Sequence, residues 1–134
     1  MNQTRDNINV SCCIIINKSK ILILRRNHKG PRDGLWEFPG GKQENETSEE
    51  CAIRETFEEI EYKIDEIRFL TKVREEYKDT NIELTAFLAF SDTRFRPSLK
   101  VHDDYKWEQS TELHKYPFPE ANKKVIDLLI KDGY

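Results

Sequence analysis

Three glutamates near the middle of the chain have a spacing that would let their carboxylates act together. Glu55, Glu58 and Glu59 stand at positions i, i+3 and i+4, which converge on one side of a helix at about 100° per residue. Carboxylates at this spacing repel one another, so a cation is needed to stabilise them. Magnesium prefers oxygen ligands and suits such a set, with manganese as the alternative. The spacing predicts metal-assisted chemistry; a solvated acidic helix face is the competing interpretation.

The residues around these glutamates predict the helix that carries them. Thr47 and Glu50 are three residues apart in the order of a capping box, which predicts a helix over residues 48–61. Three apolar residues fall on the side of this helix that lies opposite the glutamates: Ile53, Phe57 and Ile60. We expect that apolar side to enter the core.

A segment with adjacent glycines precedes the helix. Gly40, Gly41 and Lys42 follow one another, and glycine lets the backbone approach a metal ion or a phosphate closely. From residue 18 to residue 42 the chain has seven lysines and arginines against two acids, although its net charge is −3. This local positive charge favours guidance of a phosphate-bearing ligand, and an ordinary soluble loop explains it equally well.

The whole pattern resembles the Nudix box, the signature of the Nudix hydrolase superfamily. The order is a glycine, five residues, Glu46, seven residues, Arg54-Glu55, two residues and Glu58-Glu59. The resemblance implies that the three glutamates hold one to three magnesium ions. It also implies that a glycine carbonyl, that of Gly41, joins them as a metal ligand.

Three residues of the box are expected to shape the site: Gly40, Glu46 and Arg54. Arg54 points away from the convergence of the glutamates and can reach Glu58 at i+4 or the preceding loop, so we interpret it as an organiser of the site.

The chain departs from the family pattern in three places. Thr56 stands where an aliphatic residue is usual, and Glu61 stands where glycine is usual. The loop is also one residue shorter than the common form, so Gly40 and Gly41 compete for the position of the box glycine.

The stretch LWEFPGGK, residues 35–42, resembles the MutT branch of the superfamily, the nucleoside-triphosphate pyrophosphohydrolases. This implies attack of water on a nucleoside triphosphate with release of the monophosphate and pyrophosphate, and oxidised guanine nucleotides such as 8-oxo-dGTP are candidate substrates. Arg26 would then pair with phosphate and Asn122 with the base. Glu37 and Lys42 are further candidate substrate contacts. The proton acceptor would be one of three acids: Glu58, Glu59 or Asp104.

Other functions remain open on the same scaffold. Tyr77 lies roughly where some diadenosine-polyphosphate hydrolases of the superfamily carry a tyrosine, so a diadenosine polyphosphate is an alternative substrate. ADP-ribose is a further alternative, which the absence of a proline near Tyr77 slightly disfavours. A non-catalytic regulatory module that binds a nucleotide or a protein partner is the second alternative, although such modules often lack the glutamates that this chain has. A prenyl-diphosphate isomerase is the third, and no residue supports it.

The apolar pattern predicts the elements that surround the box helix. Strands are expected at residues 9–17, 21–24, 67–75 and 82–90, with a short one leading to Trp107. An amphipathic helix with Pro119 in its first turn runs to Lys131. With the resemblance, this predicts an α/β (α+β) fold of the Nudix type, an α/β/α sandwich with a mixed β-sheet between the box helix and the C-terminal helix.

The composition sets the outer limits of this interpretation. With 134 residues, 37% hydrophobic and 35% charged, the chain is expected to form one domain, 1–134, with residues 1–8 flexible. No apolar run approaches about 20 residues and no signal peptide opens the chain, so we expect a cytoplasmic protein without membrane contact. The three cysteines, an odd number, favour a reducing compartment. The expected partner is a small nucleotide, not a nucleic-acid polymer, and the expected state is a monomer or weak homodimer. His28 and His102 are expected on the surface.

Overall fold

A computed structural model describes residues 6–26 and 34–134 of the chain. The strands are β1 (Asp6–Asn17), β2 (Lys20–Arg26), β3 (Trp36–Glu37), β4 (Gly40–Lys42), β5 (Arg68–Glu76), β6 (Thr80–Phe90) and β7 (His102–Glu108). The helices are α1 (Ser48–Ile60), the short 3₁₀ helix η1 (Ser110–Lys115) and α2 (Glu120–Lys131). All four long strands predicted from the sequence are present, and so are both helices.

The seven strands form one mixed sheet with β1 near its centre. The strand order is β3-β2-β1-β6-β5, while β4 pairs with β1 and β7 pairs with β2. β1 and β6 run parallel, and the other pairs are antiparallel. β1 starts at Asp6 because its first residues pair with β6, from Asp6 opposite Thr80 onward. Of residues 1–8, which were expected to be flexible, 6–8 lie in this strand, and 1–5 lie outside the described residues.

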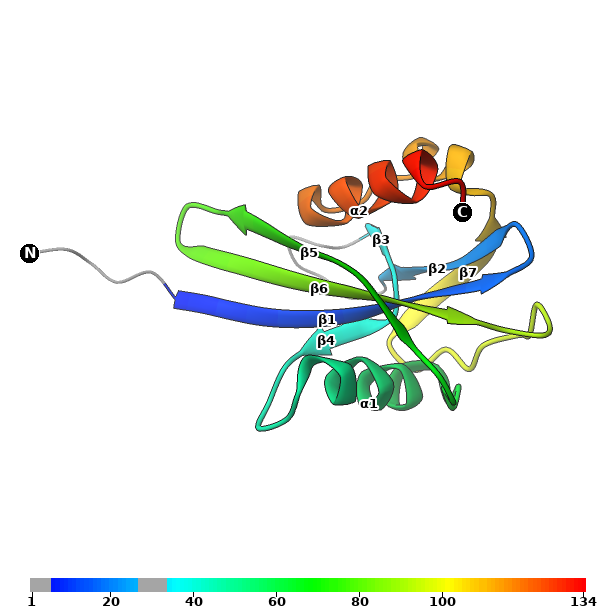
Figure 1. Ribbon diagram of the computed structural model, residues 1–134, viewed down its shortest axis with the longest axis horizontal. Coiled ribbons are helices and arrows are strands. Elements are labelled where there is room, and N and C mark those ends of the chain that lie inside the picture. Colours follow the sequence, from blue (N-terminus) through cyan, green and yellow to red (C-terminus); the bar gives the residue numbers. More distant parts are fainter. Residues whose placement is uncertain (1–5, 27–33) are drawn as a thin grey trace, which may run out of the picture.

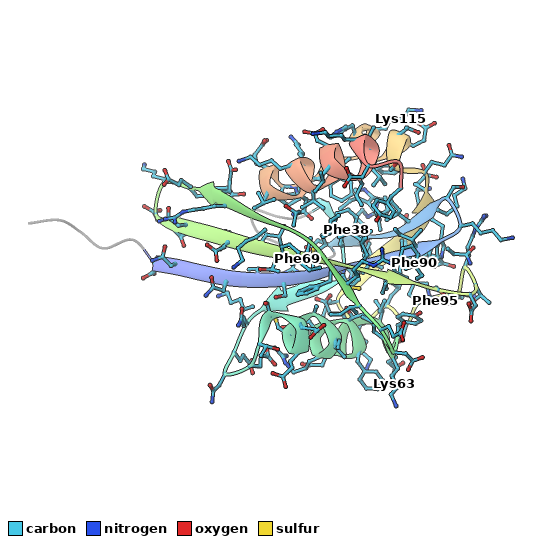
Figure 2. The ribbon with its side chains drawn as sticks, in the orientation of Figure 1. Phe38, Lys63, Phe69, Phe90, Phe95 and Lys115 are labelled. Atoms are coloured by element: carbon cyan, nitrogen blue, oxygen red, sulfur yellow. The ribbon has the colours of Figure 1, made fainter. Side chains whose placement is uncertain are left out.

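The two long helices cover opposite faces of the sheet (Figure 1). On the α2 face the core contains Ile14, Ile23, Leu88, Val125 and Leu129, among others. On the α1 face a smaller core contains Cys13, Ile15, Leu22, Leu24 and Ile60. Side chains fill both layers, and Figure 2 shows Lys63 and Lys115 projecting outward on opposite sides of the sandwich. The predicted α/β/α sandwich is confirmed. Within the described part of the chain, neither helix has the length and apolar character needed to cross a membrane.

The capping box sets the start of α1, as predicted. The backbone N–H of Glu50 donates to the Thr47 side chain, and the Glu50 carboxylate accepts from the Thr47 backbone N–H. On the opposite face of the sheet, the start of α2 differs slightly from the prediction. Pro119 is its N-cap residue and does not lie in the first turn.

The buried side of α1 differs from the prediction. Phe57 was expected in the core, yet it is 52% exposed. The buried residues of the helix are Cys51, Ala52, Thr56, Glu59 and Ile60. Small side chains at 52 and 56 let the helix lie close over β1 and β4, and this rotates Phe57 away from the sheet. The same rotation carries Glu59 onto the buried side, which has consequences for the site.

Replacing Thr56 with Val should stabilise the protein. Thr56 is fully buried, and among the described residues its hydroxyl has no hydrogen-bond partner. Valine has nearly the same shape without the polar atom, so we expect a gain of about 1 kcal/mol in the free energy of unfolding. Thr56→Ser is the matched control, because it keeps the hydroxyl, and it should destabilise. Chemical denaturation measures both; a less stable Thr56→Val protein would contradict the assignment.

Replacing Glu61 with Gly should also stabilise the protein. Glu61 ends α1 with φ 56° and ψ 28°, a left-handed conformation that glycine adopts without strain. Its exposed ion pair with Lys100, 3.3 Å long, contributes little in return. The net gain should be about 0.5–1 kcal/mol, a rise in Tm of a few degrees. Glu61→Ala, which loses the ion pair but keeps the strain, should show no such rise in a thermal melt.

Candidate active site

One cavity of about 400 Å³ brings together most of the residues that the sequence singled out. Its polar wall comes from β2, β3, β4 and α1, and its apolar wall comes from β1, β6 and the start of α2. Eight candidate residues line it: Arg26, Glu37, Gly40, Gly41, Lys42, Glu55, Glu59 and Asn122. An anionic group and an apolar ring could therefore be accommodated side by side.

The two glycines of β4 let α1 approach the sheet. The backbone N–H of Gly40 donates to Glu59 Oε1 at 3.0 Å. A Cβ atom at Gly40 would overlap the backbone of β1 at Ser11, whereas a Cβ at Gly41 would overlap the Glu55 carboxylate. The carbonyl of Gly41 accepts a weak hydrogen bond from the Cys51 thiol at 3.5 Å. Gly40 is thus required by strand pairing and Gly41 by the carboxylate site.

The carboxylates in the cavity oppose one another's ionisation. Burial, together with the charges of Glu37 and Glu55, raises the pKa of Glu59 to about 8, against the lowering effect of the Gly40 hydrogen bond. Burial also raises the pKa of Glu55. A set of close oxygen donors that resists full ionisation is what a hard divalent cation stabilises. The described residues therefore fit a divalent metal.

Arg54 fixes the loop before α1 to the helix. Its guanidinium donates to both oxygens of Glu46 at 2.8 and 2.7 Å and to both oxygens of Glu58 at 2.8 and 3.0 Å. The hydrogen bonds from Arg54 hold the pKa of Glu46 at about 2. Arg54 thus makes both contacts that the sequence predicted. Glu58 is half-exposed and lies outside the residues that line the cavity.

A second polar group lies beside Glu59, and one of its members, His102, was not expected there from the sequence. Glu37 Oε2 accepts from Arg26 Nη1 at 3.0 Å and contacts His102 Nε2 at 2.8 Å. The His102 side chain is fully buried, so its expected place on the surface is wrong. No local signal marks this histidine, because it reaches Glu37 through a register shift in the pairing of β2 with β7. His28 lies outside the described residues.

The remaining candidates are divided between the cavity and the far face of the sheet. Asn122 lines the cavity, as does Tyr77. Asp104 pairs with Arg25 across β2 and β7, and strand alternation places it on the face opposite Arg26. Its carboxylate accepts from the backbone N–H of Tyr105. The structure does not bring Asp104 to Glu55 and Glu59.

Comparison with known proteins shows which family this chain is similar to. A sequence model of the NUDIX domain matches residues 11–128. The chain is 36% identical over 126 residues to the 8-oxo-dGTP diphosphatase of Buchnera aphidicola, covering 92% of this chain and 93% of that protein. It is 28% identical over 123 residues to the CTP pyrophosphohydrolase of Escherichia coli K12, covering 90% and 89%.

The fold is also similar to that of a solved structure. The crystal structure of the MutT protein from Methanosarcina mazei superposes with a TM-score of 0.85 at 20% sequence identity, covering 98% of this chain and 99% of that one. The family match spans the box, α1, most of the residues that line the cavity and most of α2. This chain therefore belongs to the Nudix hydrolase superfamily and is MutT-like, a hydrolase of pyrophosphate bonds.

Proposed function

We propose that this protein hydrolyses nucleoside triphosphates to the monophosphate and pyrophosphate with magnesium, or with manganese in its place. Oxidised guanine nucleotides such as 8-oxo-dGTP are the proposed substrates, supported by the name of the Buchnera relative. The observation that carries the proposal is one cavity that joins Glu55 and Glu59 of α1 to an apolar wall that includes the Asn122 amide. Three free buried cysteines support a cytoplasmic place of action.

The metal would be held by Glu55, Glu58 and Glu59, with the carbonyl of Gly41 as a further ligand. Bound there, the cation supplies charge neutralisation on phosphate oxygens and lowers the pKa of water. Glu58 must exchange its hydrogen bonds with Arg54 for this role, since both of its oxygens are now paired. Of the three acids that are candidate proton acceptors, Glu59 is favoured, because it lines the cavity, whereas Glu58 and Asp104 do not.

The substrate would be bound at both walls of the cavity. Arg26 and Lys42 would meet phosphate oxygens, and Glu37 would hold the Arg26 side chain in position. Asn122 has no side-chain hydrogen bond to the described residues, so its amide is available to a base edge as donor and acceptor. Tyr77 and the apolar residues of β6 would contact the face of the base.

Turnover over a substrate panel tests the proposal. The panel contains ordinary and 8-oxo nucleoside triphosphates, CTP among them, together with diadenosine polyphosphates and ADP-ribose. We expect pyrophosphate and a monophosphate from triphosphates, with 8-oxo-dGTP preferred. Cleavage of only dinucleoside or sugar-linked compounds would keep the carboxylate chemistry and remove the roles of Arg26 and Asn122. Binding without any turnover would favour the regulatory module.

A further inference from the structure

The buried histidine of β7 belongs to a chain of contacts that ends at the cavity wall. His102 Nε2 lies 2.8 Å from Glu37 Oε2, and the same oxygen accepts from Arg26 Nη1 at 3.0 Å. Glu37 and Arg26 line the cavity, whereas His102 does not. The three residues come from three strands, β7, β3 and β2, so each fixes the position of the next.

The chemistry of the pair settles which atom carries the proton. The same Glu37 oxygen accepts from Arg26, and with this oxygen as the acceptor in both contacts, His102 Nε2 donates to Glu37. The imidazole is completely buried, and Nδ1 has no partner among the residues described. A buried ring with one unpaired nitrogen carries a free-energy penalty, and the hydrogen bond to Glu37 is the contact that offsets it.

A metal ion is a weaker explanation for this group. Oxygen or nitrogen donors of Glu37, Glu59 and His102 lie within 4.8 Å of one another, as metal ligands do. However, the positively charged Arg26 guanidinium already donates to the Glu37 oxygen that contacts His102. It would repel a metal ion bound at the same oxygen. The donors of this group are better satisfied by hydrogen bonds than by a metal.

We propose that His102 is a positioning residue for substrate binding, acting through Glu37 on Arg26. By holding Glu37 Oε2, the histidine fixes the carboxylate that accepts from Arg26 Nη1. The Nη2–H groups of Arg26 would then meet a phosphate group in the cavity. This inference rests on the proposed function, because it assigns Arg26 to the substrate phosphates. His102 itself touches no substrate.

Steady-state kinetics of two matched variants test the role. His102→Leu removes the donor, while His102→Gln can place an amide N–H near the position of Nε2. For the best triphosphate substrate we expect His102→Leu to raise KM about ten-fold or more with kcat changed about two-fold at most. His102→Gln should restore most of the KM. Equal KM values in folded wild type and His102→Leu, or no rescue by His102→Gln, would overturn the proposal.

A double-mutant cycle keeps the test decisive if His102→Leu does not fold. Glu37→Gln retains the side-chain shape and should itself raise KM. His102→Asn, whose shorter amide should not reach Glu37, should also raise KM alone, and it should change KM no further when it is added to Glu37→Gln. Independent, additive effects would refute the relay. Nuclear magnetic resonance of the His102 imidazole separates this outcome from failure of the proposed function. Its Nε2–H proton should exchange slowly in wild type and faster in Glu37→Gln, whether or not any triphosphate is cleaved.

Discussion

Glu59→Gln should abolish turnover and at the same time make the metal-free protein more stable. Glu59 is buried, holds the Gly40 N–H and lies between the charges of Glu37 and Glu55. The amide of Gln can still accept from Gly40, but it cannot ionise to bind a cation or accept a proton. We expect kcat to fall about 10³-fold or more. The rise in Tm that magnesium gives the wild type should be lost as well.

The stability of this variant depends on pH in a defined direction. The folded state raises the pKa of Glu59 above its unfolded value, so the native protein binds this proton more tightly than the unfolded chain does. The stability that Glu59 contributes is present below about pH 4.5 and is lost as the pH rises through about 8. Metal-free Glu59→Gln should lack this loss.

Denaturation of metal-free wild type and variant at pH 6 and pH 9 measures the difference. The free energy of unfolding of Glu59→Gln should exceed that of wild type by more at pH 9 than at pH 6, and the increase should be on the order of a few kcal/mol. Glu66→Gln is the control, because Glu66 is exposed and the change in charge is the same. If Glu59→Gln were active, Glu59 would have no role in catalysis. If the stability difference between the two proteins were smaller at pH 9 than at pH 6, the raised pKa of Glu59 would be contradicted.

Replacing each of the two β4 glycines with alanine should have different effects: at Gly41 it should mainly lower activity, and at Gly40 it should mainly lower stability. At Gly41 the new Cβ meets the end of the Glu55 side chain, which can rotate away. The fold should survive with a loss below about 1.5 kcal/mol, while the displaced carboxylate lowers kcat/KM about 100-fold. At Gly40 the new Cβ meets the β1 backbone, which cannot move without breaking the β1–β4 pairing. Gly40→Ala should therefore unfold more easily by about 2–4 kcal/mol.

Thermal melts and kinetics of both variants distinguish the two roles. Gly34→Ala is a useful comparison, because a Cβ there has open space and meets only the strain of φ +79°. If Gly41→Ala were fully active, the close contact with Glu55 would have no catalytic meaning. If Gly40→Ala were as stable as wild type, β4 would be free to shift, and the glycine would not be required by pairing.

The sequence predicted the position of α1 in the chain better than it predicted which side of the helix is buried. Thr47, Glu50 and the period of α1 defined the helix correctly, because caps and periodicity act within a few residues. The buried side was wrong at Phe57, because the small side chains of Ala52 and Thr56 bring the helix closest to β1 and β4. Which side of α1 is buried depends on a sheet assembled from segments that are distant in the sequence. No local sequence pattern holds that information.

The same reason explains the errors around Glu37. Strand alternation suggested nothing about His102, whose contact needs the irregular pairing of β7 with β2. Asp104 was a candidate proton acceptor from the sequence, yet alternation across the sheet places it on the other face. By contrast, Glu55, Gly41 and Asn122 were found from motifs, and the cavity that they line joins β4, α1 and α2.

The parallel pairing of β1 with β6 also governs the order in which a growing chain can fold. Eleven residue pairs join Asp6–Ile16 to Thr80–Phe90, across a separation of 74 positions. During synthesis the apolar strand β1 must wait for most of the chain to emerge before one of its edges is covered. Nascent chains that stop before β6 therefore present an unpaired, apolar strand edge. Pausing of the ribosome between α1 and β6 would prolong the interval in which this protein is most exposed to aggregation and most dependent on chaperones.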